Sequence, residues 1–209
     1  VLKTIDELIK EEQEKAPRDV EFVSIMDSNE FLFASIHEVV KTLVEAIILV
    51  ILVVFIFLQS VRSSIIPLIS IIVSLVGTFA ALALLGFSIN MLTLFALVLA
   101  IGTVVDDAVI VVEAVQAKFE AGYRSAYQAT VDAMQGISSA IVTSTLVFMA
   151  VFIPVSMMGG TSGIFYTQFG ITMAIAVGIS GINALTLSPA LCAIMLKPHA
   201  EGEHKQGLG

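Results

Sequence analysis

Two long stretches of this chain contain no charged residue, and they constrain its fold more than any other feature. Asp, Glu, Lys and Arg are absent from residues 63–105 and again from residues 133–196. A soluble core does not require such runs, whereas pairs of membrane-spanning helices of about 20 residues each do. The composition, 57% hydrophobic and only 13% charged, is also far from that of a soluble globular domain. The sequence therefore predicts an all-α polytopic membrane helix bundle.

The apolar segments predict five transmembrane helices within a bundle over residues 32–198. Pro67 falls in the first turn of the second helix, where its missing N–H matters least. Pro189 falls near the end of the fifth. Most links between the helices are short, but residues 116–135 form a longer polar link that we expect to be helical. The predicted spans are residues 39–58, 65–85, 91–115, 136–158 and 164–196.

The two ends of the chain lie outside this predicted bundle. An amphipathic helix over residues 2–16 and a strand over residues 20–26 are typical of a short α/β remnant of a soluble domain, which we place at residues 1–31. Residues 199–209 form a tail. Because the chain starts inside such a unit and without a methionine, we expect it to be a piece of a longer protein.

Basic residues predict how the bundle is oriented in the membrane. The loops at residues 86–90 and 158–163 carry no Lys or Arg. Cytoplasmic loops carry an excess of these residues, so the other side is predicted to be the cytoplasm, together with the C-terminus. The N-terminal segment is then periplasmic, and the membrane is the bacterial inner membrane. The basic residues on the cytoplasmic side are Arg62, Lys118, Arg124, Lys197 and Lys205.

The third predicted helix carries two adjacent acids, Asp106 and Asp107, inside the otherwise apolar run 91–112. One charged carboxylate at mid-membrane depth costs about 2.5–3.5 kcal/mol on insertion scales, so such residues are functional candidates by default. At 100° per residue the two acids cannot point in one direction. Asp107 lies on the same helix stripe of small and polar residues as Thr103, and Asp106 lies at the edge of that stripe. We therefore expect both acids to face the bundle interior.

Three interpretations of the acid pair are open. The acids can form a structural ion pair, but no predicted span carries Lys or Arg in its middle, so the cation must come from elsewhere. An aspartyl protease needs two carboxylates that converge to about 3 Å, which neighbours on one helix do not do. A proton relay needs a carboxylate that alternates between charged and neutral forms, and physical reasoning favours this interpretation.

Small residues at four-residue spacing predict where helices touch, because they let backbones approach closely in lipid. We expect a compact bundle rather than independent anchors. The two predicted packing ridges are Gly136, Ala140 and Ser144, and Gly170, Ala174 and Gly178.

Other signals are weak. His37, Glu38 and Glu45 include a single histidine and are better explained by a solvated interfacial helix, so we expect no metal site. The single cysteine, Cys192, excludes an internal disulfide. The net charge of −8 comes largely from the first 45 residues, and no nucleic-acid partner is expected.

Several collinear motifs resemble the resistance-nodulation-division (RND) efflux pumps. Residues 35–50 are similar to the second transmembrane helix of that family, and residues 98–113, VLAIGTVVDDAVIVVE, to the fourth, which bears an Asp-Asp pair. The likeness covers roughly residues 20–198. The pair Asp106-Asp107 matches the hydrophobe/amphiphile branch of multidrug pumps. The remaining matching segments are residues 86–90, 152–155, 158–169 and 187–198.

The resemblance implies helices two to six of a trimeric, proton-driven antiporter in its N-terminal half. It implies Asp106 and Asp107 as the proton relay, a Lys counter-charge from the missing second half, a periplasmic adaptor and an outer-membrane channel. It implies amphiphilic substrates, no enzymatic activity and no cofactor beyond the proton-motive force. Two positions depart from close relatives: Thr103, which could tune the relay, and Thr167, where Arg is common.

The function predicted from the sequence is therefore proton-driven export of amphiphilic compounds across the inner membrane. Two alternatives remain open at this point. One is a membrane scaffold or assembly component that keeps the fold without transporting. The other is an RND exporter of another substrate class.

Overall fold

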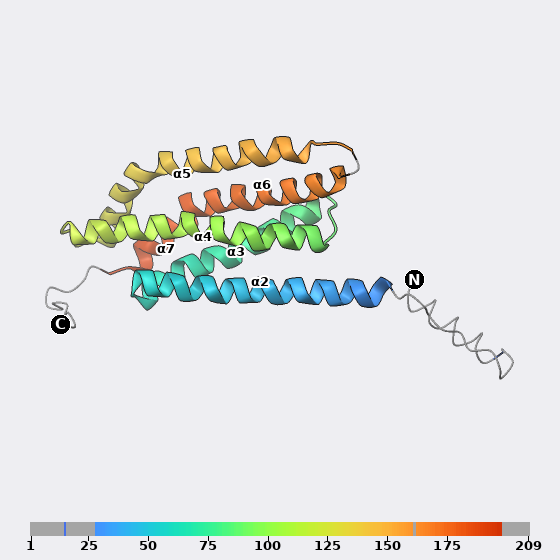
Figure 1. Ribbon diagram of the computed structural model, residues 1–209. Helices are drawn as coiled ribbons and strands as arrows, with labels where there is room; N and C mark the ends of the chain where they lie inside the picture. The colour runs from blue at the N-terminus through green and yellow to red at the C-terminus, as the bar shows by residue number, and fades with distance from the viewer. Residues whose placement is uncertain (1–14, 16–27, 161, 198–209) are drawn as a thin grey trace, which may run out of the picture. The chain divides into compact units, whose positions relative to one another are not determined.

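The computed structural model describes residue 15, residues 28–160 and residues 162–197, and every element within them is a helix (Figure 1). The predicted strand over residues 20–26, the tail at residues 199–209 and all but residue 15 of the predicted helix over residues 2–16 lie outside this part. The elements are α2 (Ser28–Leu58), α3 (Val61–Leu84), α4 (Met91–Glu120), α5 (Ala126–Ser156), α6 (Gly163–Leu185) and α7 (Leu187–Met195).

Five helical segments are long and apolar enough to cross a membrane, the fifth formed by α6 and α7 together. The predicted all-α polytopic bundle is therefore confirmed. The chain divides into two compact units, Val1–His37 and Glu38–Gly209, and the second contains the bundle. Within it α4 and α6 pack against each other, and each also contacts α3, α5 and α7.

The helices are longer than the predicted spans, most clearly around the link at residues 116–135. α4 continues to Glu120 and α5 starts at Ala126, so only residues 121–125 are non-helical. Gly122 takes φ +97 in this turn, a conformation that L side chains rarely adopt. The Tyr123 hydroxyl donates a hydrogen bond to the Asp132 carboxylate across the turn, and this bond raises the pKa of Tyr123. Polar residues of this link thus form a hydrogen-bonded turn between α4 and α5.

The fifth predicted span, residues 164–196, corresponds to the apolar segment Gly163–Met195, and the structure adds a break within it at Thr186. Thr186 has φ −122 and ψ −66, and α7 starts at the next residue. Pro189 explains the break: it has no N–H to donate to the carbonyl of Leu185, four residues earlier, and its ring would clash with that carbonyl. α6 accordingly ends at Leu185. Pro189 thus lies near the end of this span, as predicted, and it also divides the span into two helices.

Of the two predicted packing ridges, Gly136, Ala140 and Ser144 lie on the exposed side of α5 and pack against no described helix. The face of α5 that meets α6 is turned away by about one residue, or 100°. It consists of Thr145, Met149, Phe152 and Ser156.

The other ridge, on α6, lies at the α5–α6 contact. A Cβ atom built on Gly170 would come within 2.9 Å of the Phe152 carbonyl oxygen, whereas one on Gly178 would meet the Met149 sulfur at 3.6 Å. Gly181, which the sequence pattern missed, is also tight, because a Cβ there would lie 2.5 Å from Thr145 Oγ1. Glycines thus set the distance between these two helices.

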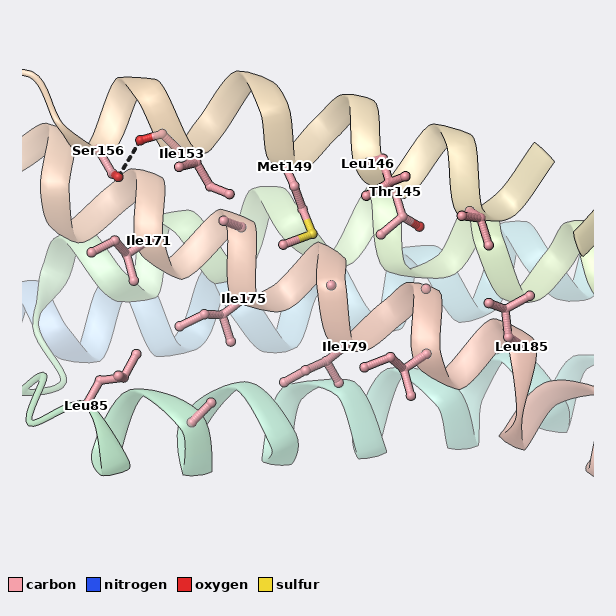
Figure 2. Close-up of a pocket in the computed structure, with 16 residues that line it drawn as sticks. Leu85, Thr145, Leu146, Met149, Ile153, Ser156, Ile171, Ile175, Ile179 and Leu185 are labelled. Carbon is pink, nitrogen blue, oxygen red and sulfur yellow. Dashed lines mark hydrogen bonds between the residues drawn. The ribbon is translucent and has the colours of Figure 1, made fainter. Parts of the chain in front are cut away.

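Between these close approaches, α5 and α6 leave an apolar groove of about 630 Å³ (Figure 2). Met149 and Ile153 of α5 line it together with Ile171, Ile175 and Ile179 of α6, and Leu85, which directly follows α3, lies at one end. An apolar lining of this kind suits contact with lipid chains better than contact with water.

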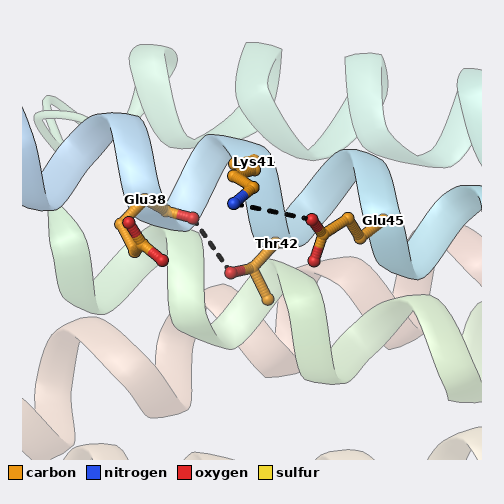
Figure 3. A network of polar contacts seen from close by, with 4 residues as sticks. All are labelled: Glu38, Lys41, Thr42 and Glu45. Atoms are coloured by element: carbon orange, nitrogen blue, oxygen red, sulfur yellow. Dashed lines mark hydrogen bonds and ion pairs between the residues drawn. The ribbon is translucent and has the colours of Figure 1, made fainter.

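The outward face of α2 carries the acids that were weighed as a metal site. Glu45 lies 3.9 Å from Lys41 in an exposed ion pair, and the Thr42 hydroxyl donates to the backbone carbonyl of Glu38 (Figure 3). Exposed pairs one helical turn apart contribute only a few tenths of a kcal/mol, about 0.3–0.5. Val54 and Leu58, further along the same helix, join the buried core.

Candidate functional site

Asp107 lies at the contact between α4 and α6, where one of its carboxylate oxygens accepts a hydrogen bond. The donor is the Ser180 hydroxyl, 2.7 Å away. The same Ser180 oxygen lies 3.4 Å from the Val104 carbonyl oxygen, one turn before Asp107. Ser180 is 2% exposed and Asp107 is half-buried. The carboxylate is therefore held by a buried hydroxyl from a helix far away in the sequence.

Asp106 faces none of the other described helices, so within this part of the chain only Asp107 meets the expectation that both acids face the interior. α3, α5 and α6 pack around the rest of α4, so only one face of the helix remains open. Asp106 is exposed in the middle of that face. The apolar residues that share it are Phe95, Leu99 and Ile110. The two acids thus have different surroundings: one is bonded inside the bundle, and one lies on an uncovered helix face.

Thr103 does not supply the hydroxyl that reaches Asp107. Its Oγ1 donates to the Ala100 carbonyl at 2.8 Å, a bond within its own helix. Back-bonding of this kind is common for Ser and Thr in helices and leaves the hydroxyl without a free proton. The hydroxyl that donates to Asp107 belongs to Ser180 instead.

Further buried polar contacts continue from the acid site, and sequence reasoning missed them. Asn183 Nδ2 donates to Ser74 Oγ at 2.8 Å, and Ser70 Oγ lies 3.0 Å from Ser188 Oγ. A signal was present: Ser70, Ser74 and Thr78 recur every four residues on an otherwise apolar helix, the pattern of one polar helix face.

The described residues contain no group of three or more His, Cys, Asp or Glu side chains that could hold a metal ion. Nor does either aspartate form an ion pair with a Lys or Arg in this part of the chain. The basic residues of the described bundle beyond α2 lie at helix ends, at Arg62, Lys118, Arg124 and Lys197. Within the described residues the site therefore consists of two carboxylates and the Ser180 hydroxyl that donates to one of them.

The fold and the site define a multi-pass α-helical membrane protein with an acid pair in a central span. Residues 1–208 match the AcrB/AcrD/AcrF family, and the chain belongs to this family, the AcrB type of the RND superfamily. The resemblance seen in the sequence is thereby confirmed.

Individual relatives agree with this assignment. The chain is 45% identical over 207 residues to the multidrug export protein AcrF of Escherichia coli K12, covering 99% of this chain and 20% of AcrF. It is 44% identical to the toluene efflux pump membrane transporter TtgB of Pseudomonas putida, with the same coverage. It is 46% identical over 189 residues to the multidrug resistance protein MdtF of E. coli K12, covering 90% of this chain and 18% of MdtF. The chain thus spans about a fifth of the length of these relatives.

Proposed function

We propose that this chain is the proton-carrying part of an efflux transporter that exports amphiphilic compounds, driven by the proton-motive force. Asp106 and Asp107 take up protons from one side of the membrane and release them to the other. The observation that carries the proposal is the pair of unlike environments on adjacent residues of one membrane helix. The transporter needs no cofactor, and it is not a classical enzyme.

The two environments supply what a relay requires. Asp107 accepts a hydrogen bond from Ser180 in its charged form, and loss of that charge changes the contact between α4 and α6. Asp106 lies on the uncovered face of α4, where a cation from another part of the complete protein can approach. A Lys from the second half of the pump is the partner that we assign to that face. Binding and release of protons then alters helix packing on two sides of α4.

The substrate class and the assembly rest on the family. The relatives are named as multidrug and toluene efflux proteins, so amphiphilic small molecules are the proposed substrates. The proposed assembly is a homotrimer in the bacterial inner membrane that works with a periplasmic adaptor and an outer-membrane channel.

Proton-coupled flux tests the proposal directly. The test uses a full-length transporter that carries this segment, reconstituted in vesicles with an imposed pH gradient. We expect it to move a fluorescent amphiphile in one direction while protons move in the opposite direction. A pH-sensitive dye inside the vesicles reports the proton movement, and vesicles without a gradient serve as the control. A correctly inserted protein that moves neither protons nor amphiphile would support the scaffold alternative and refute the proposal.

The orientation gives a separate prediction. Gly159 and Ala121 are both exposed at loop positions, at opposite ends of α5, and a side chain at Gly159 would meet nothing within 4 Å. In a Cys192→Ala background, we expect a membrane-impermeant thiol reagent added from the periplasm to modify Gly159→Cys and to spare Ala121→Cys. This expectation follows from the basic residues on the Ala121 side. Labelling with the two positions reversed would overturn the orientation.

A further inference from the structure

The break between α6 and α7 is spanned by one edge of α3. Ser74 receives the Asn183 bond before the break at Thr186, and Ser70 contacts Ser188 after it. The two serines lie one turn apart on α3, and they are 1% and 2% exposed. α3 therefore holds both sides of a helix break that Pro189 creates.

The α6 part of this broken span also contacts the acid site, through Ser180. Ser180, which donates to Asp107, precedes Asn183 by three residues, so the two side chains diverge by about 60° around α6. One reaches α4 and the other reaches α3. Two bonds to two different helices fix the rotation of α6 about its own axis.

We propose that Ser74 and Asn183 are positioning residues for the acid site, because they set the rotation of α6 that places the Ser180 hydroxyl opposite Asp107. Neither side chain is hydrogen-bonded to Asp106 or Asp107. When Asp107 takes up a proton, the change in its bond to Ser180 is passed through α6 to α3. This inference rests on the proposed relay role of Asp107.

The energetics allow such a role. Polar side-chain bonds between helices in membranes are worth about 0.6 kcal/mol on average and up to about 1.7. That range is too small to hold the fold together, but it is enough to bias the orientation of one helix. A nearby hydroxyl makes only an intrahelical contact: Thr78, 0% exposed, donates to the Ser74 carbonyl at 2.7 Å.

The test compares Ser74→Ala with Thr78→Val in the full-length transporter that carries this segment. Both changes remove one buried hydroxyl from the same face of α3, but only the first breaks a bond to α6. We expect Ser74→Ala to lower the maximal transport rate about three- to fifteen-fold, with the half-saturating substrate concentration unchanged. Thr78→Val should retain the native rate. If Ser74→Ala does not accumulate in the membrane, Asn183→Leu removes the same bond without leaving an unpaired amide.

A double-mutant cycle separates positioning from a general structural role. If Ser74 acts through Ser180, then Ser74→Ala combined with Ser180→Ala is no slower than Ser180→Ala alone. If the two substitutions instead lower the transport rate independently, so that their fold-changes multiply in the double variant, the inference is wrong. The infrared carboxyl band of Asp107 should also shift in Ser74→Ala and stay in place in Thr78→Val. An unshifted band in Ser74→Ala, with Asp107 still titrating, refutes this inference alone. An Asp107 that never changes protonation refutes the proposed function itself.

Discussion

We expect Asp107→Asn to abolish export by a full-length transporter that carries this segment, reducing drug resistance to that of cells without it. The amide has the shape of the carboxylate and can still accept the Ser180 hydroxyl, which lies 2.7 Å from Asp107 in the native site. The fold should therefore survive. An amide cannot take up and release a proton, so coupling to the proton-motive force is lost. Dye efflux in cells with native pumps deleted measures the effect, and Asp106→Asn should behave in the same way.

Glu113→Gln is the matched control for these variants. Glu113 is an exposed carboxylate on the same helix, nearly two turns beyond Asp107. Its amide variant should export at the native rate. Membrane-inserted protein must be quantified for every variant, because only inserted transporter is informative. Native efflux by well-inserted Asp106→Asn and Asp107→Asn proteins would end the relay hypothesis.

The second large effect concerns the α5–α6 contact. We expect Gly170→Ala to destabilise the transporter, because the added methyl group would lie 2.9 Å from the Phe152 carbonyl oxygen and 3.0 Å from the Ser156 backbone nitrogen. Backbone atoms cannot move aside as a flexible side chain can, so the two helices must separate. Overpacking of this kind typically costs about 1–3 kcal/mol. A lower melting temperature of the purified protein in detergent measures it.

Gly178→Ala provides the comparison on the same helix. The new methyl group there would meet only the Met149 side chain, its sulfur at 3.6 Å and its methyl carbon at 3.8 Å, which are ordinary van der Waals contacts. Both substitutions raise helix propensity by about 1 kcal/mol, so that contribution cancels between them. Equal melting temperatures for the two variants would show that the close approach at Gly170 does not control this packing.

The sequence alone predicted the features that depend on local composition. Hydrophobicity and length decide whether a segment can cross a membrane, so the five spans, and the position of the acid pair inside one of them, could be predicted. The motifs around Asp106 and Asp107 also placed the chain in its family. The polar link at residues 116–135 is mostly helical, as predicted, but helix ends were less accurate, because this link is the continuation of two spans.

Only the tertiary structure decided which way each helix face points. Periodicity fixes the angle between Asp106 and Asp107, but not which of them meets α6, because that depends on where the neighbouring helices lie. For the same reason, the predicted packing ridge of α5 begins at Gly136, whereas the face of α5 that contacts α6 contains Thr145. The sequence by itself thus determined that this is a membrane bundle with two acids in one span. The packing of α6 determined which acid receives a partner, and that this partner is Ser180, because pairing across helices is a property of their mutual rotation.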